Sequence, residues 1–491
     1  MGNLKYRYII LLSLFIGLMF SACNKNWDNH DAVTDPILTV NLLAQINKNP
    51  DLSTFSSYLV KTGYDKVIAS SKTFTIWAPT NAALAKLDQS WVTDTAKLKQ
   101  FVGNCISYQS YLTTAPNPVL TIRTLNGKNI LFTKTKFEEA NIVTADRYVG
   151  NGILHTVDLA VLPKLNGWDY LNSTSTSIQK TFLQSLNYTY FDPTRAVVTG
   201  IDPITGLSIY QPNTGYFQGN YFLNRATVNN EDAKYTFVIL TDAAFTAEKA
   251  KIGKYFTVNN PLNTAARNTF MSDSITNWNV VKDLAFVGDF SASLPDTLIS
   301  RDSVKIHLDP SAIVETHKVS NGVVYVMSRI DYKMSSKIRP IVIQGENFYD
   351  YLNTSGTRSM LTRRNPFTNV DFREIYFHTM TIASYWVRYK PTLYNAAYKV
   401  YWVAVRDFST TAVAPAVPVL FPQRVAFGTS ALITTLPYTN VTILNYNEVY
   451  AGTYTASTWG ITDTFLVANT TIVDGTNSIV CDYIKLVPVL N

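Results

Sequence analysis

Aromatic and arginine side chains gather in one stretch of the chain, between residues 385 and 406. A flat aromatic ring can stack on the apolar face of a sugar ring, and arginine side chains can donate hydrogen bonds to its hydroxyl groups. The candidate ligand contacts are Tyr385, Trp386, Arg388, Tyr389, Tyr401, Trp402 and Arg406, with Tyr394 and Asp407 as further candidates.

The elements that position these side chains are strands. Side chains alternate across a strand, so Tyr398 and Trp402 share one side of residues 398–406, whereas Tyr401 lies on the other side. One of the two sides must face a core. We therefore expect at least half of these aromatic residues to be structural.

No pattern of reactive residues indicates catalysis. The five histidines, at positions 30, 155, 307, 317 and 378, lack metal-ligand spacing, and there is no phosphate loop, nucleophile elbow or dinucleotide fingerprint. We predict a protein that is not an enzyme, with no catalytic residue, metal or cofactor. A hydrolase stays open as an alternative, because the two carboxylates of a glycosidase pair in space. Its candidates would be Asp371 with Glu374, or Asp482.

The composition favours an extracellular binding protein. Charged residues make up 16% of the 491 residues, the net charge is +7, and 30 residues are tyrosine. A Tyr-rich, lightly charged composition is shared by extracellular β-rich proteins and glycan binders. Lysine and arginine form no run, which argues against a nucleic-acid partner. The length predicts about three domains.

The N-terminal residues resemble a bacterial lipoprotein signal. Lys5 and Arg7 precede an uncharged, mostly apolar run, residues 8–20, which is shorter than the roughly 20 residues of a membrane-spanning helix. The following Phe-Ser-Ala-Cys sequence resembles a lipobox. This resemblance implies a signal peptide at 1–22, lipidation of Cys23, a tether at 23–36 and an outer-membrane location with the body exposed at the surface. We expect Cys105 and Cys481 to be buried rather than joined in a disulfide.

Two pairs of motifs recur in the same order. The sequence Phe-Thr-Ile-Trp-Ala-Pro-Thr-Asn-Ala-Ala-Leu at 74–84 is repeated in altered form at 235–245, and the Asn-Gly segment at 151–157 is repeated at 321–327. Such repetition predicts two copies of one domain, at 37–165 and 166–339. Helical periodicity, β-branched runs and Asn-Gly turns predict an α+β unit in each copy.

These motifs resemble the boxes of the fasciclin domain, with His155 and Asp158 in place. The resemblance implies adhesion or binding at a cell surface. Cys105 stands where many family members have a histidine, and Tyr325 replaces His155 in the diverged second copy. That copy also carries an insertion at 192–225. We expect its aromatic residues to pack onto their own domain, with a binding hairpin as the alternative; they are Tyr210, Tyr216, Phe217, Tyr221 and Phe222.

Residues 340–491 read as strand after strand, with Pro, Gly and Asn between them. This spacing predicts a β-sandwich or jelly roll. Residues 477–488 resemble the last strand of galactose-binding-like domains, a fold that hosts many carbohydrate-binding modules. The predicted fold class is thus multidomain: two α+β fasciclin-like domains followed by an all-β sandwich or jelly roll.

The leading hypothesis is a lipid-anchored surface protein that binds without catalysis. Its architecture resembles lipoproteins of the Bacteroidetes type, which often accompany TonB-dependent glycan uptake. That resemblance implies three partners: the membrane through the lipid, a polysaccharide or oligosaccharide, and an outer-membrane transporter or other surface protein. The alternative is an adhesin or structural subunit that binds proteins through its fasciclin-like domains.

Overall fold

The computed structural model describes residues 35–114, 118–406, 420–428, 434–471 and 477–490. The expected signal peptide, Cys23, most of the tether and Asp407 lie outside these residues. Two compact units are formed. Unit 1 contains the described residues up to Asp169 with 229–232 and 319–321, and unit 2 contains the rest. The domain boundaries expected from the sequence stay predictions.

Unit 1 packs short helices onto one sheet. Polar caps begin several of them: the Asn41 side chain accepts from the backbone N–H of Ala44 at 2.8 Å, and Thr80 Oγ1 accepts from that of Ala83 at 3.2 Å. The helices are η1 (Pro36–Thr39), α3 (Leu42–Asn47), η2 (Pro50–Leu52), α4 (Ser53–Thr62), α5 (Tyr64–Ile68), α6 (Asn81–Leu84), α7 (Gln89–Thr93) and α8 (Thr95–Asn104).

The sheet of unit 1 has seven strands, in spatial order β2 (Ile106–Tyr108), β1 (Phe74–Pro79), β7 (Gly152–Val157), β6 (Ala140–Val149), β5 (Lys136–Phe137), β4 (Asn129–Thr133) and β3 (Val119–Arg123). Strands β1 and β7 run parallel and place Trp77 opposite His155. One apolar cluster includes residues of α3, α4 and α8 together with Phe74 and Ile76 of β1. A second forms around Trp77. The predicted α+β character of this region is confirmed.

The second copy, most of which lies in unit 2, repeats this pairing. Its main sheet has the order β13 (Ala285–Val287), β12 (Tyr235–Leu240), β17 (Gly322–Met327) and β16 (Ile313–Val319). Strands β12 and β17 are parallel, and Val238 lies opposite Tyr325 as Trp77 lies opposite His155. Thr241 caps the next helix, as Thr80 does in the first copy. The two parallel pairs thus share one register, as the repeat predicts.

Further elements of the second copy surround this sheet. The helices are α9 (Gly167–Ser173), α10 (Ile178–Ser185), α11 (Asp242–Gly253), η3 (Lys254–Phe256), α12 (Ala265–Val281), η4 (Pro310–Ala312) and α13 (Met334–Lys337). A small sheet contains β14 (Thr297–Ile299), β15 (Lys305–His307) and β18 (Asp331–Tyr332). Among the described residues, no helix is both long and apolar enough to cross a bilayer.

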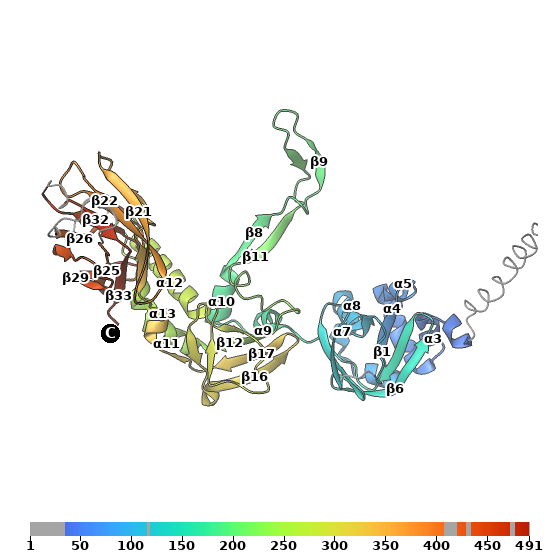
Figure 1. Cartoon of the computed structure of the whole chain (residues 1–491). Helices are drawn as coiled ribbons and strands as arrows, with labels where there is room; N and C mark the ends of the chain where they lie inside the picture. The colour runs from blue at the N-terminus through green and yellow to red at the C-terminus, as the bar shows by residue number, and fades with distance from the viewer. Residues whose placement is uncertain (1–34, 115–117, 407–419, 429–433, 472–476, 491) are drawn as a thin grey trace, which may run out of the picture. The chain divides into compact units, whose positions relative to one another are not determined.

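The insertion forms an arm that projects from the second copy (Figure 1). Two antiparallel pairs build it: β8 (Asn187–Phe191) with β11 (Tyr216–Asn220), and β9 (Val198–Ile201) with β10 (Ser208–Tyr210). The arm therefore begins at Asn187, five residues before the expected insertion. Of its five predicted core aromatics, Phe222 alone lies in the core. The expectation that they pack onto their own domain is wrong for the rest, whose rings contact Tyr188, Tyr190 and Phe191 of β8.

The C-terminal region is mostly β, as predicted. One sheet has the order β19 (Ile341–Gln344), β33 (Tyr483–Pro488), β25 (Ala397–Val403) and β29 (Val449–Thr455). A second has the order β20 (Asp350–Tyr351), β23 (Trp386–Tyr389), β31 (Asp463–Ala468), β26 (Phe421–Gly428) and β27 (Thr434–Thr435), with β28 (Thr439–Val441) paired to β26. Smaller sheets comprise β21 (Thr357–Arg364), β22 (Asp371–His378) and β32 (Ile479–Cys481), and β24 (Thr392–Leu393) with β30 (Gly460–Ile461). Side chains of both main sheets share one core cluster, as in a sandwich.

Candidate functional site

Burial divides the predicted ligand contacts into two groups. Tyr385, Tyr389 and Trp402 are 0%, 1% and 0% exposed and belong to the shared core of the C-terminal region. Their prediction as ligand contacts is corrected, because a ring enclosed by core side chains offers no face to a ligand. Tyr389 instead donates a hydrogen bond to the Gly345 carbonyl at 3.0 Å.

The other predicted contacts lie outside that core. Trp386 and Arg388 alternate with Tyr385, Val387 and Tyr389 and therefore lie on the outer side of the six-stranded sheet. Tyr401 lies on the four-stranded sheet, with its ring 5.5 Å from that of Tyr450. Arg406 follows β25 and its guanidinium lies 5.0 Å from the Phe421 ring. The structure thus brings only Trp386 and Arg388 together.

Cross-strand register extends the surface around Trp386. One row contains Trp386, Val467 and Arg424, and the next contains Arg388, Phe465 and Ala426. Cross-strand partners share a face, so all six side chains lie on the same side of the sheet. Phe465, Val467 and Ala426 are buried and form its apolar base, against which Trp386 packs edge-on with ring centroids 5.3 Å apart. We call this surface the Trp386 face.

Charged groups on this face are fixed in orientation. The Arg388 guanidinium binds the Asp350 carboxylate in a bidentate pair, with Nε 2.7 Å from Oδ1. Arg388 Nη1 lies 3.9 Å from Asp463 Oδ2. The Arg424 guanidinium lies 4.5 Å from the ring of Tyr438. The Arg388 guanidinium lies 5.9 Å from the centroid of the Trp386 ring, and Arg424 provides a second cation on the same face.

Two polar atoms of the Trp386 face are buried and unsatisfied. Arg424 Nε and Asp463 Oδ1 have no hydrogen-bond partner among the described residues. Leaving a buried donor or acceptor unpaired costs about 1–3 kcal/mol. The two atoms lie at separate positions on the face, because Arg424 is opposite Val467 and Asp463 is opposite Gly428. A sugar has several hydroxyl groups, each of which can donate and accept.

His155 has a structural position in the first copy. Its ring is fully buried and stacks on Trp77 with centroids 5.9 Å apart. Nδ1 accepts a hydrogen bond from the Asp146 backbone N–H at 3.2 Å, and Nε2 lies 3.0 Å from the Tyr111 carbonyl, to which it donates. Burial lowers the pKa of His155. The arrangement fits a neutral imidazole that ties strand β6 to the segment that follows β2.

The carboxylates that a hydrolase would need are engaged elsewhere. Glu374 is fully buried and forms an ion pair with Arg363, with Nε and Oε2 2.6 Å apart. Burial raises its pKa to about 8, although Arg363 acts in the opposite direction. Asp371 pairs with Arg364 at the surface. Burial, with a smaller contribution from Glu346, raises the pKa of Asp482 to about 6. No group of three or more metal-ligating side chains lies together in the described part of the chain.

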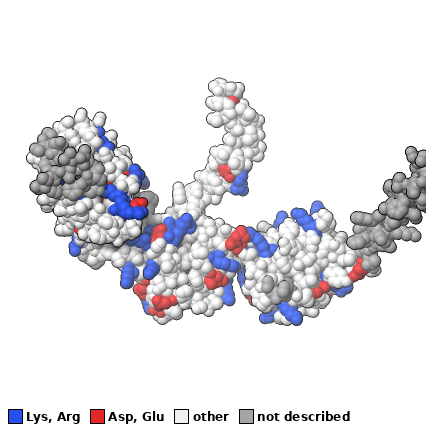
Figure 2. Space-filling model, viewed as in Figure 1, with Lys and Arg blue, Asp and Glu red and all other residues white. Residues whose placement is uncertain are grey.

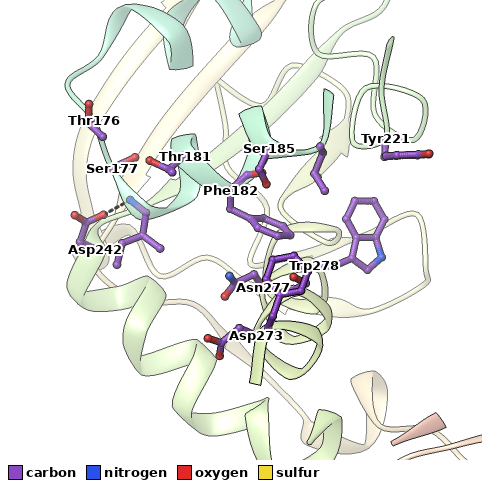
Figure 3. A pocket seen from close by; sticks show the side chains of 14 residues that line it. Thr176, Ser177, Thr181, Phe182, Ser185, Tyr221, Asp242, Asp273, Asn277 and Trp278 are labelled. Atoms are coloured by element: carbon purple, nitrogen blue, oxygen red, sulfur yellow. Dashed lines mark hydrogen bonds between the residues drawn. The ribbon is translucent and has the colours of Figure 1, made fainter. Parts of the chain in front are cut away.

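A groove in the second copy was not predicted from the sequence. It lies between α10 and α12, has a volume of about 970 Å³ and is mainly apolar (Figure 3). Phe182 points from α10 towards α12, and Phe270 and Trp278 of α12 also line the groove. The polar groups around it are Thr176, Ser177, Thr181, Ser185, Asp242, Asp273, Ser274 and Asn277. The only sequence signal was two aromatic residues eight apart in a helical segment.

Comparison with known proteins identifies one part of the chain. Residues 50–163 match the model of the fasciclin domain family. This match suggests adhesion or binding, and no enzyme family is identified. No curated protein matches the chain.

Solved structures share only limited similarity with the chain. A FAS1 domain pair from the insect cell adhesion molecule Fasciclin I is 14% identical, with 60% of this chain and 100% of that chain covered and a TM-score of 0.21. The carbohydrate-binding module CBM36 in complex with calcium and xylotriose is 16% identical, with 30% and 98% covered and a TM-score of 0.20. A family 35 module from Clostridium thermocellum is 12% identical, with 31% and 99% covered and a TM-score of 0.19. TM-scores this low do not establish a shared fold.

Proposed function

We propose that this protein is a non-catalytic, lipid-anchored surface protein that binds glycan on the Trp386 face. One observation carries the proposal: a partly exposed tryptophan ring lies on a sheet face that also carries a buried donor, Arg424 Nε, and a buried acceptor, Asp463 Oδ1, which lack partners among the described residues. The fasciclin match at residues 50–163 supports a binding role for the chain in general.

The chemistry of the face favours a neutral, ring-shaped ligand. The Trp386 ring offers an apolar surface for the C–H groups of a sugar. The face also carries both signs of charge, because Arg388 lies near Asp350 and Asp463, and Arg424 adds a second cation. A strongly anionic or cationic ligand would meet repulsion from one set. A hydroxylated neutral ligand meets donors and acceptors alike.

The N-terminal sequence supports the location. The run at 8–20 and the lipobox-like residues before Cys23 would place the folded units outside the cell on a lipid anchor. In that setting the protein would hold glycan near an outer-membrane transporter of the TonB-dependent type. Metabolic labelling with a fatty acid, compared between the natural chain and Cys23→Ala, tests the anchor.

The glycan test uses the chain without its first 23 residues, which keeps every described residue. We expect binding to one class of plant, host or microbial polysaccharide on an array. Trp386→Ala should weaken binding about tenfold, the equivalent of about 1.4 kcal/mol, because a stacked ring is lost. Tyr450→Ala removes an exposed ring from the other main sheet and is the matched control.

Two outcomes contradict the proposal. A chain that binds no glycan would leave the alternative of protein adhesion through the fasciclin-like domains. Binding that is lost in Tyr450→Ala but kept in Trp386→Ala would move the site to the sheet that carries Tyr401.

A further inference from the structure

The distal half of the arm exposes a set of aliphatic side chains. Ile204 at the tip is 92% exposed, and Ile201 and Leu207 beside it are each 68% exposed. Between residues 196 and 211 the only charged side chain is Asp202. Figure 2 shows charged side chains midway along the arm and an acidic one near its tip, with mostly uncharged surface between them. Exposed apolar groups gathered in this way indicate an interaction surface.

The proximal half of the arm exposes aromatic rings. Tyr190, Phe191 and Tyr216 are more than one-third exposed, and Phe191 and Tyr216 contact each other with ring centroids 5.2 Å apart. No apolar side chain between residues 192 and 215 is buried. The arm therefore gains little from the core of its own chain, and its apolar surface lacks a partner within it.

The groove lies at the root of the arm. Leu186, which directly precedes β8, and Tyr221, which directly follows β11, both line it. The tip is at the other end of the ribbon (Figure 1). At about 3.3 Å per residue, the residues from Asn187 to Ile201 separate tip and root by several tens of ångströms. A tip therefore does not reach the groove of its own chain.

We propose that the arm docks on a second copy of this chain by reciprocal exchange, each tip entering the groove at the root of the other arm. Two arms that run antiparallel about a two-fold axis place tip against root at both ends. Such an interface is isologous and closes as a dimer. It covers the tip aliphatics, the rings along the arm and the walls of the groove together.

The charge at the tip argues against insertion of the arm into a membrane. The Asp202 carboxylate accepts hydrogen bonds from the backbone N–H groups of Ile204 at 2.8 Å and Thr205 at 3.0 Å. These bonds lower its pKa and keep it ionised. An ionised carboxylate is costly within a bilayer. In a groove that is open to water, the carboxylate can stay hydrated while Ile201, Ile204 and Leu207 become buried.

The groove can receive the apolar side chains of the tip. Of its two carboxylates, Asp273 pairs with Lys249 at 2.9 Å, and Asp242 accepts a hydrogen bond from the Ile178 N–H at 2.8 Å. Asn277 Oδ1 is buried and has no hydrogen-bond partner among the described residues. A backbone N–H of the entering tip would satisfy it.

Light scattering after size-exclusion chromatography tests the dimer, with the chain that lacks its first 23 residues. We expect twice the monomer mass at high concentration. Ile204→Lys at the tip and Phe270→Asp in the groove should each raise the dissociation constant at least tenfold. Both side chains are exposed, so the fold should persist. Val287→Lys, at a residue 79% exposed in the same unit, is the control.

A disulfide tests the pairing of tip and groove directly. Cys105 and Cys481 are buried and free, so Ile204→Cys with Phe270→Cys should yield a cross-linked dimer on oxidation. The control pair, Ile204→Cys with Val287→Cys, should not yield a cross-linked dimer.

Three outcomes of the scattering experiment would overturn the proposal: a monomer at every concentration, open-ended oligomers, or a dimer that survives both Ile204→Lys and Phe270→Asp. A monomer that binds phosphatidylglycerol vesicles, and loses this binding in Ile204→Lys, would also overturn the proposal and would assign the tip to a membrane.

Discussion

At the scale of single residues, His155 shows how a polar side chain is accommodated inside unit 1. One ring nitrogen accepts from the Asp146 N–H, and the other donates to the Tyr111 carbonyl. Both hydrogen bonds are made by the neutral ring. A second proton on Nδ1 would face a backbone N–H and break the first bond. The Asp146 carboxylate, 4.0 Å away, only partly offsets this cost.

This geometry predicts a pH dependence for unit 1. The folded pKa of His155 lies below its ordinary value of 6.5 because of burial. As the pH falls through 6.5, the unfolded chain takes up the proton first, so unit 1 loses stability below about pH 7. Hydrogen exchange of the β1 and β7 amides should show lower protection at pH 5 than at pH 7.5, after correction for intrinsic rates. His155→Gln should lack this slope; the same slope in that variant would contradict the assignment.

At the scale of elements, local signals were readable from the sequence and non-local ones were not. Strand β1, the Thr80 cap of α6 and the turn at Asn151-Gly152 each depend on residues at or beside those positions. The start of the arm depends on pairing of β8 with β11, which follows 25 residues later. The groove combines Phe182 with Phe270 and Trp278, which are separated by nearly 90 residues or more. Neither pairing leaves a local pattern.

For a similar reason, only part of the candidate site could be predicted from the sequence. Side chains alternate along the strand that contains Trp386, but both of its sides carry aromatic residues. Hydrophobicity alone therefore did not decide which side faced the core. Tyr385 and Tyr389 point inward, and Trp386 and Arg388 point outward. Arg424 and Asp463 come from other strands, and only the sheet register places them on the same face as Trp386.

The parallel strand pair of each copy depends on a glycine. Gly322 has φ +139°, and a Cβ atom there would lie 1.9 Å from the Tyr235 carbonyl oxygen of the paired strand. Gly322→Ala should therefore destabilise unit 2 by about 2–4 kcal/mol, because the strands must separate. Gly200→Ala, in open space on the arm, is the control and should change stability little. Urea unfolding checks both, and equal midpoints for the two variants would refute the prediction.

At the scale of the whole molecule, the chain combines two compact units with one arm that stands apart from their cores. We expect replacement of residues 192–215 by Asn-Gly, which can join β8 to β11 as a hairpin, to leave the melting temperature of unit 2 unchanged. The same variant should be monomeric. Calorimetry and light scattering measure the two properties, and a marked fall in melting temperature would show that the arm supports the fold after all.

The separation of the arm from the cores has an evolutionary consequence. A substitution at a core position such as Trp77 or Trp402 is first screened by whether the chain still folds. A substitution between residues 192 and 215 escapes that screen, because no apolar side chain there is buried. Selection can therefore act on what the arm recognises without also acting on stability. Related chains should diverge faster in the arm than in the sheets, and a new partner could be acquired there with few changes elsewhere.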